Sequence, residues 1–491
     1  MDPSVSSIYS SLSDLVLSER IFKDKAELLF KLVELMEVHE NMVGPGIFMM
    51  IRPRGFGISL ITQSIIKLVK ACDERDEFML NSNPKIIDDY LLHQNNPLFV
   101  EDNYHSYKNT TRNKTDLEIE RLKREYKIRD ELKKNSTEEQ EIEAIKSLYN
   151  LPQRPVLVID FKHLVAYNAK SFRDSLMEIL QEQFWINHLE SHQSPFMKPE
   201  VYFDRLLHLL YEKYHQEIAI IIDNYDEPFI SASQFDKNEQ DEAVLDYLDL
   251  LNVIKYHKAS IKWVLLTGHI NFALASETSE GLPLVQDLSS NPMFAGLFGI
   301  TKTDLIELYG KELNKFAENQ HLSLDSYITR LEKCYGGFLF ADDESDLRNQ
   351  TLPKMFNPAS IAHCISNNGR LLPYATSGRY KFLKKALLSN PKDLDWLFGK
   401  DGQDPLFSDS IELQVRGKKL GTLLLQLGFA TRTKMTVNQT STYITWRYRF
   451  DYPNLDMKKT LEYILADENN KPDITTPIDF EHEDEEEFYQ P

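Results

Sequence analysis

The segment at residues 47–60 constrains the fold of this chain more than any other. Residues 47–51 form a continuous apolar run, which is typical of a strand buried on both faces of a sheet. Two glycines follow at positions 55 and 57, and residues 59–71 then repeat apolar side chains at helical spacing. A buried strand, a tight glycine turn and a helix start, in this order, predict a phosphate-binding loop.

The loop lacks the lysine that normally reaches the β- and γ-phosphates, because Ile58 stands directly before Ser59. An isoleucine supplies neither a charge nor a hydrogen-bond donor. The backbone N–H groups from Gly55 through Gly57 to Ser59 can still cradle an anion at a helix start. The pattern therefore predicts the frame of a nucleotide-triphosphate site from which a central part has been removed.

Two arginines and an aspartate extend this candidate site. Arg52 and Arg54 can add positive charge for a nucleotide or another anion, or they can shape the turn and pair with Asp223 or Asp226. Asp223 ends the strongest apolar run in the chain, and Asp223 with Ser59 is the candidate for a Mg²⁺ site. ATP with Mg²⁺ is accordingly the cofactor that the pattern admits.

Strands and helices alternate through the first half of the chain. Buried strands are expected at residues 47–51, 155–161, 218–223 and 261–268. Helices are expected near residues 170–188, 201–215 and 239–256. This alternation predicts an α/β fold with a mostly parallel sheet flanked by helices, of the kind found in P-loop NTPases.

Helices dominate after about residue 303, and a β-hairpin is expected near the end. The expected helices lie near residues 303–319, 323–334 and 358–367. The predicted parts are a flexible N-terminus (1–20), a P-loop domain (21–302) with a charged helical insertion (73–153), a helical lid region (303–378), a small winged-helix-like α+β domain (379–466) and a disordered acidic tail (467–491).

Composition excludes several classes of protein. The formal net charge is −20, so most of the surface repels nucleic-acid phosphate and a general DNA-coating role is not expected. The three cysteines, Cys72, Cys334 and Cys364, form no C-x-x-C pair, which disfavours a zinc ribbon or a disulfide framework. No stretch approaches the roughly 20 apolar residues of a membrane span.

Several short motifs, in order, resemble those of bacterial AAA-ATPase-like proteins, which often carry a C-terminal nuclease domain of the PD-(D/E)XK type. They lie at residues 22–25 (FKDK), 52–60 (RPRGFGISL), 222–228 (IDNYDEP), 266–268 (LTG), 291–301, 335–338 (YGGF), 356–360 (FNPAS) and 376–378 (TSG). The resemblance covers about residues 20–455 and implies a P-loop ATPase core.

The departures from this family fall where its chemistry would be. Ile58 replaces the phosphate-loop lysine, and Asn224 follows Asp223 where the family has the glutamate that activates water. The family places an arginine after the strand at 261–268, and here the segment from His269 to Asn271 stands in its place, with Asn271 as the substituted position. The resemblance therefore implies a degenerate member that has lost three groups of different types.

The nuclease part of the family is also expected to be absent. The nearest fragment to its metal site has Gln414 where the catalytic lysine should stand. The glutamate-rich end at 481–487 resembles export signals of some bacterial type IV secretion systems, which makes a host-directed effector a further expectation. The predicted location is cytoplasmic or exported into a host cell.

The sequence thus favours a degenerate AAA-ATPase-like protein that acts without NTP hydrolysis as an interaction or regulatory protein, with protein partners. The alternative is a nucleotide-binding or weakly active ATPase with a non-standard loop. A role in nucleic-acid processing is suggested only by the nuclease domain that proteins of the resembling family often carry.

Overall fold

The computed structural model describes residues 25–38, 45–69, 154–190, 197–274, 282, 285–340, 354–375, 380–389, 410–413, 415, 418–439, 444–466 and 477–478. The expected N-terminal segment 1–20 and the insertion 73–153 lie outside these residues, as does most of the acidic tail. None of the described helices is long and apolar enough to cross a membrane.

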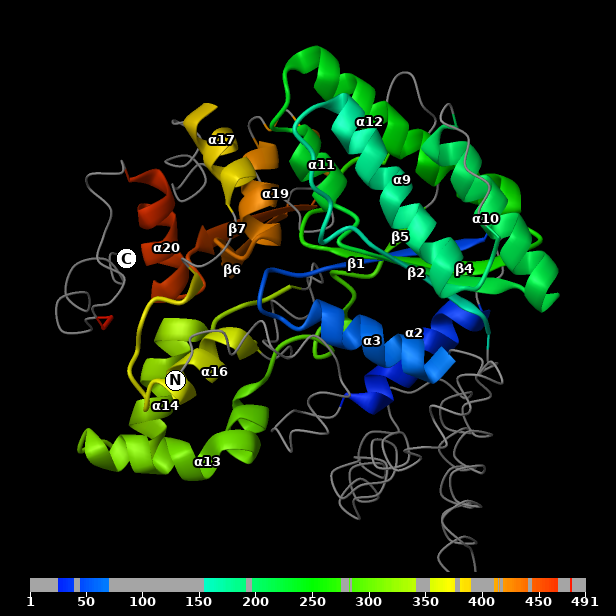
Figure 1. Ribbon diagram of the computed structural model, residues 1–491. Helices are drawn as coiled ribbons and strands as arrows, with labels where there is room; N and C mark the ends of the chain where they lie inside the picture. Colours follow the sequence, from blue (N-terminus) through cyan, green and yellow to red (C-terminus); the bar gives the residue numbers. More distant parts are fainter. Residues whose placement is uncertain are drawn as a thin grey trace, which may run out of the picture.

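Five parallel strands form the central sheet, which confirms the predicted α/β fold with its P-loop-like architecture (Figure 1). The strands are β1 (Gly46–Ile51), β2 (Val156–Asp160), β3 (Ile218–Asp223), β4 (Ile261–Gly268) and β5 (Gln286–Asp287). Their order is β2-β3-β4-β1-β5, with every pairing parallel. β4 therefore separates β1, which leads into the glycine turn, from β3, which ends in Asp223.

The burial of the strands explains their composition. Every residue of β1 and β3 is buried, as expected when helices cover both faces of a parallel sheet. In Figure 1, α2 (Ala26–Val38) and α3 (Ile58–Val69) lie together on one side of the sheet. The opposite side carries α9 (Ala169–Ile186), α10 (Pro199–Tyr214) and α12 (Lys237–Asn252).

The predicted helix at 239–256 is divided, because α12 ends at Asn252 and the 3₁₀ helix η3 (Val253–His257) continues it. A short helix, α11 (Glu227–Ala232), follows β3 directly, and the 3₁₀ helix η4 (Pro292–Phe294) follows β5. The strand β5 is not among the predicted strands. Its two residues, Gln286 and Asp287, carry no apolar pattern that sequence analysis can detect.

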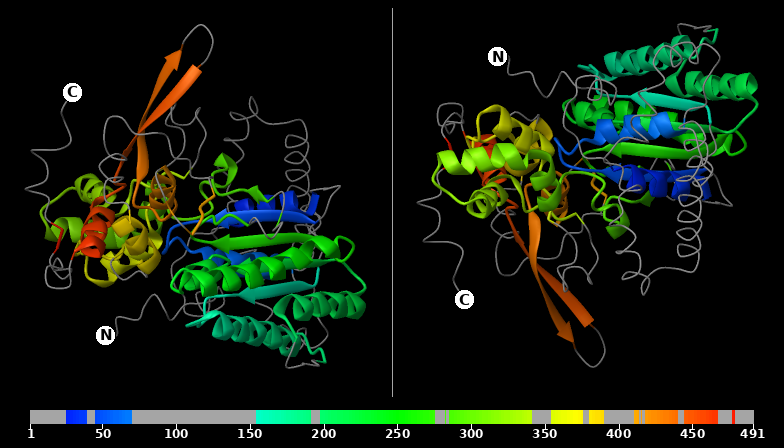
Figure 2. Two further views of the ribbon diagram at one scale, coloured as in Figure 1. Left: turned by 90° about the horizontal axis from the view of Figure 1, so that it is seen from above. Right: turned by 90° about the horizontal axis from the view of Figure 1, so that it is seen from below.

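The second half of the described chain is helical up to a hairpin. Its helices are α13 (Lys302–Asn319), α14 (Leu324–Tyr335), α16 (Pro358–Ser366), α17 (Lys381–Ser389), α19 (Lys418–Gln426) and α20 (Leu455–Leu465). Strands β6 (Thr431–Gln439) and β7 (Ile444–Asp451) pair antiparallel, which confirms the predicted hairpin. The hairpin extends away from the helices around it (Figure 2). A winged-helix arrangement of this part stays a prediction.

Two hydrophobic clusters form among the residues that the structure describes. The larger contains the sheet and its flanking helices, and it also contains residues of α17, α19 and α20, among them Phe382, Leu423 and Leu461. The smaller joins α13, α14 and α16, and Ile478, from the segment expected to be a disordered tail, packs into it with 4% of its surface exposed. The sheet therefore shares its core with helices from the predicted C-terminal domain.

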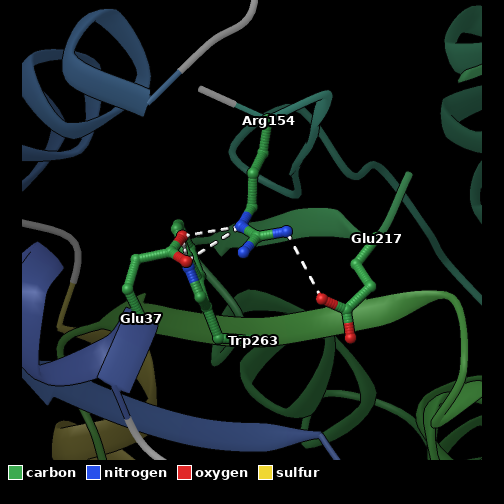
Figure 3. A network of polar contacts seen from close by, with 4 residues as sticks. All are labelled: Glu37, Arg154, Glu217 and Trp263. Atoms are coloured by element: carbon green, nitrogen blue, oxygen red, sulfur yellow. Dashed lines mark hydrogen bonds and ion pairs between the residues drawn. The ribbon is translucent and has the colours of Figure 1, made fainter. Parts of the chain in front are cut away.

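The two ends of the segment between α3 and β2 meet at the amino ends of the strands. The Arg154 N–H donates to the Val69 carbonyl at 2.8 Å. The Arg154 side chain donates through Nε to both oxygens of Glu37 at 2.9 Å and pairs with Glu217 at 3.4 Å, while Trp263 Nε1 donates to Glu37 at 2.8 Å (Figure 3). This network joins α2, β2, β3 and β4 at the sheet edge opposite the glycine turn.

Candidate functional site

The candidate residues gather where the parallel strands end. Because β1, β3 and β4 run in the same direction and lie next to one another, the segments that follow them meet at one edge of the sheet. The glycine turn follows β1, Asp223 ends β3, and Asp160 ends β2 in direct register with Asp223. Ligands of open α/β sheets bind at this edge.

The glycine turn has the backbone shape of an anion cradle. Gly55 has a φ of +86° and Gly57 a φ of +83°, which side chains larger than hydrogen rarely adopt. α3 begins immediately afterwards, and the Gly57 carbonyl accepts its early hydrogen bond from the Ile61 N–H at 3.0 Å. The first N–H groups of α3 thus have no acceptor within the helix, which is the usual basis of phosphate binding.

Ile58, which stands at the lysine position, belongs to the hydrophobic core. Its side chain is 6% exposed and lies in the larger hydrophobic cluster. The following residue, Ser59, is exposed. The position that would deliver an ammonium group to a triphosphate is therefore used for packing.

Asp223 is the buried carboxylate of the site, with 5% of its surface exposed. Its Oδ1 accepts from Thr267 Oγ1 at 2.7 Å and from the Asn224 N–H at 3.0 Å, and the Ser59 side chain also hydrogen-bonds to it. Burial raises the pKa of Asp223 to about 6, with a further rise from Asp160, while these three hydrogen bonds oppose the increase. The structure thus brings Ser59 and Asp223 together.

Asn224, where the resemblance leads us to expect a water-activating glutamate, is directed to another residue. It has a left-handed φ of +53°, and its Nδ2 donates to Asp160 Oδ1 at 2.8 Å. The same oxygen accepts from the Lys162 N–H at 2.8 Å. Sequence analysis did not single out Asp160, although an acid that directly follows a buried strand is the signal that identified Asp223.

Arg52 is a fully buried residue and does not line the turn. Its guanidinium lies 5.0 Å from the centre of the Phe298 ring and 4.6 Å from that of Phe340. Nη1 donates to the carbonyls of Ile51 and Ser289 at 2.8 and 2.6 Å. Burial lowers the pKa of Arg52 to about 9, and the nearby charge of Asp287 opposes this.

Arg54 is partly buried, and its charge contributes to lowering the pKa of His269, where burial is the larger cause and Asp226 opposes both. His269 Nδ1 lies 2.9 Å from the Arg52 carbonyl, which requires a proton on that nitrogen for a hydrogen bond. Asp226 Oδ2 accepts from the N–H groups of His269 and Ile270 at 2.9 and 3.0 Å. Asp226 therefore caps the end of β4.

Asn271, where the resemblance leads us to expect an arginine, joins two other segments. Its N–H donates to Gln426 Oε1 in α19, and its Nδ2 donates to Asp287 Oδ2 in β5, both at 3.1 Å. It is 7% exposed. All three altered positions, Ile58, Asn224 and Asn271, thus take part in packing or in hydrogen bonds within the fold.

The donor set at this edge suits a hard cation. Ser59 Oγ and the carboxylates of Asp223 and Asp160 are oxygen ligands, and Mg²⁺ is commonly held by one or two carboxylates with substrate phosphates completing its shell. Within the described residues no group of three or more His, Cys, Asp or Glu side chains forms a metal site by itself. A bound phosphate would have to complete such a site.

Asn357, which lies in the motif at 356–360 but was not predicted to belong to the site, contacts the turn from the helical region. Its Nδ2 donates to the Arg54 carbonyl at 2.9 Å, and the Ala359 N–H donates to the Gly55 carbonyl at 3.3 Å. Asparagine followed by proline, as in Asn357-Pro358, is a signal for the start of a helix, but it does not reveal which segment the helix start contacts.

Comparison with known proteins finds similarity to a protein family in one region of the chain. A family model described as a predicted AAA-ATPase, AAA-ATPase-like, matches residues 114–278. The match contains Asp160, Asp223, Asn224 and Asn271 and begins within the expected insertion, whereas the turn at 52–59 lies outside it. No curated protein and no solved structure matches the chain.

Proposed function

We propose that this chain, in which residues 114–278 match the family model described as a predicted AAA-ATPase, acts without NTP hydrolysis as an interaction or regulatory protein. The observation that carries the proposal is the burial of Ile58 in the hydrophobic core, at the position from which a lysine would reach the phosphates. The chain keeps the shape of the turn and lacks the charge that the reaction requires.

The second altered position supports the same conclusion. A catalytic carboxylate next to Asp223 would orient or activate water, whereas the Asn224 amide accepts no proton at neutral pH and donates to Asp160. A single preorganised charge or donor commonly supplies about 3 kcal/mol of transition-state stabilisation. Losing two or three of these groups leaves little of the rate acceleration that a P-loop ATPase needs.

The retained features favour a second candidate function, the binding of a nucleotide or polyphosphate without turnover. The left-handed glycines at 55 and 57 expose N–H groups at the start of α3. Ser59 and Asp223 would hold Mg²⁺ there, with Asp160 nearby, and the ion would neutralise phosphate charge. Of Arg52 and Arg54, only Arg54 is partly exposed, so Arg54 is the arginine that could contact a bound phosphate.

Phosphate release from ATP by the full chain tests the proposal. We expect the wild type to release phosphate no faster than the Asp223→Asn variant, because the lysine and glutamate functions are both missing. Turnover near one per second in the wild type, abolished by Asp223→Asn, would contradict it. Calorimetry with ATP and Mg²⁺ then separates the two candidates: binding that Ser59→Ala weakens supports the nucleotide-binding form, and absence of binding supports the scaffold form.

Protein partners and export are the wider parts of the proposal. The expected partner surfaces are the insertion 73–153 and the C-terminal domain at 379–466, and the expected export signal is 481–487. Of these, 73–153 and 481–487 lie outside the described structure, and the C-terminal domain is described in part. A translocation assay on the full chain and on a chain ending at residue 478 tests export, because only the former carries the glutamate-rich end.

A further inference from the structure

Asn357 connects the glycine turn to helix α16 through one side chain. Its Oδ1 accepts from the Ala359 N–H at 3.0 Å and from the Ser360 N–H at 3.4 Å, so it caps the start of α16. Its Nδ2 donates to the Arg54 carbonyl at 2.9 Å. The two halves of one amide therefore hold the helix and the turn at a fixed separation.

A second contact reinforces this connection. The Ala359 N–H also donates to the Gly55 carbonyl at 3.3 Å. The approach is so close that a Cβ on Gly55 would lie 2.5 Å from Asn357 Oδ1 and 3.0 Å from the Ala359 Cβ. Only glycine fits here, for reasons of space as well as of backbone conformation.

These contacts fix the orientation of two peptide groups in the turn. In a trans peptide the carbonyl and the following N–H point in opposite directions. Since the carbonyls of Arg54 and Gly55 accept hydrogen bonds from the start of α16, the N–H groups of Gly55 and Phe56 are directed away from that helix. The helix start thus sets the direction of the donors that the turn can offer to an anion.

The connection continues from α16 to the base of the hairpin. Ser360 Oγ donates to Asp456 Oδ2 at 3.3 Å. Asp456, which is 2% exposed, also accepts from the N–H groups of Tyr374 and Ala375 at 2.8 and 3.1 Å. Because Asp456 lies in the first turn of α20, directly after β7, hydrogen bonds lead from the turn to the hairpin segment.

We propose that Asn357 is a positioning residue that couples phosphate binding at the glycine turn to helix α16 and, through Ser360 and Asp456, to α20. A phosphate or polyphosphate that holds the turn in its present shape favours the same arrangement of α16. The binding part of this inference rests on the nucleotide-binding form of the proposed function. The positioning part does not, because it concerns the turn without a ligand.

Amide hydrogen exchange of the ligand-free full chain tests the positioning part. Asn357→Asp keeps an oxygen that caps α16 and loses the donor to Arg54, whereas Asn357→Ala loses both. We expect exchange of the amides at residues 61–64, the first hydrogen-bonded amides of α3, to rise about tenfold in both variants, and exchange at the start of α16 to rise only in Asn357→Ala. Asn168→Asp, which changes the cap of α9 in the same way, is the matched control and leaves residues 61–64 unchanged. Unaltered exchange at 61–64 in Asn357→Asp overturns the inference.

Titration with tripolyphosphate and Mg²⁺ tests the coupling. In the wild type we expect the probe to slow exchange at residues 55–60 and also at residues 357–362 and 455–460, with binding about tenfold weaker in Asn357→Asp. Protection confined to 55–60 overturns the coupling. If the wild type does not bind the probe, the nucleotide-binding form fails and the coupling fails with it, while the ligand-free exchange still decides the role of Asn357.

Discussion

Asp223 combines deep burial with a carboxylate that a metal or a phosphate site would need in its charged form. Its pKa is raised from 3.8 to about 6, mainly by burial. A folded-state pKa above the unfolded value means that the folded protein holds this proton more tightly than the unfolded chain. The contribution of Asp223 to stability is therefore most favourable at low pH, and it declines as the pH rises from about 4 to above 6.

This titration gives a pH-dependent difference between the wild type and Asp223→Asn. Because asparagine does not ionise, we expect the variant to gain about 2–3 kcal/mol of unfolding free energy relative to the wild type between pH 4 and pH 8. Urea denaturation of both proteins at several pH values measures the difference. A difference that stays constant across this range would show that Asp223 is not held in a buried, raised-pKa environment.

Ile58 provides a test of the argument on which the proposed function depends. Placing a lysine at this 6% exposed position brings an ammonium group into the core, so we expect Ile58→Lys to lose about 2–4 kcal/mol of unfolding free energy. Ile58→Leu keeps the volume and should lose less than about 1.5 kcal/mol. Chemical denaturation measures both. If Ile58→Lys were as stable as the wild type, the side chain at this position would reach solvent and the site would be closer to an ordinary phosphate loop than proposed.

At the scale of single residues, the sequence predicted which residues lie near the site but not where their side chains point. It identified Ile58 and placed Ser59 and Asp223 in one candidate site, because both belong to segments that follow buried strands. It also offered Arg52 as an anion ligand, whereas the structure buries that side chain with its guanidinium over the rings of Phe298 and Phe340. The spacing of Arg52 and Arg54 around a proline carries no information about which of the two arginines enters the core.

At the scale of elements, the clearest polar junction is the one that Arg154 makes with Glu37 between β2 and α2. Arg154 is 12% and Glu37 6% exposed at their side chains, so the pair is largely removed from solvent. Trp263 donates to the same carboxylate at 2.8 Å. Without Arg154, the buried Glu37 carboxylate would keep only the neutral Trp263 N–H among these donors.

We therefore expect Arg154→Ala to reduce the free energy of unfolding by about 3–5 kcal/mol. Arg173→Ala is the matched control, because Arg173 is 35% exposed and pairs with Glu242, which is 54% exposed, and with Asp246. Its loss should amount to about 1 kcal/mol or less. Equal losses in the two variants, measured by urea denaturation, would argue against a structural role for the buried junction.

The sequence predicted the strands and helices themselves better than it predicted which of them lie next to one another. Apolar runs identify β1, β3 and β4 because both faces of these strands are buried, and the same signal gives no order in the sheet. β4 lies between β1 and β3 although it follows both in the chain, and only the register shows that Asp160 stands beside Asp223. The division of 239–256 into α12 and η3 depends on tertiary packing, which helical periodicity alone does not contain.

At the scale of the whole molecule, the predicted boundary at residue 379 falls between parts that share one core. Phe382 of α17 packs edge-on against Phe272, which follows β4, with ring centres 5.4 Å apart. Ile411 exchanges backbone hydrogen bonds with Asn271 and Ala273 at 2.7 and 2.9 Å. A sequence can show a change from strands to helices at such a boundary, but it does not show whether the two sides bury apolar surface against each other.

Truncation tests how far this shared core extends. A chain that ends at residue 378 loses α17, α19 and α20 and exposes the apolar residues that they cover, so we expect it to aggregate or to lose its cooperative thermal transition. A chain that ends at residue 478 keeps every described element and should unfold within a few degrees of the full chain. Circular dichroism and size-exclusion chromatography measure both. Cooperative unfolding of the shorter chain near the temperature of the full one would show that the sheet folds without the C-terminal helices, and contacts such as the bond from Asn271 to Gln426 would then join two independent domains.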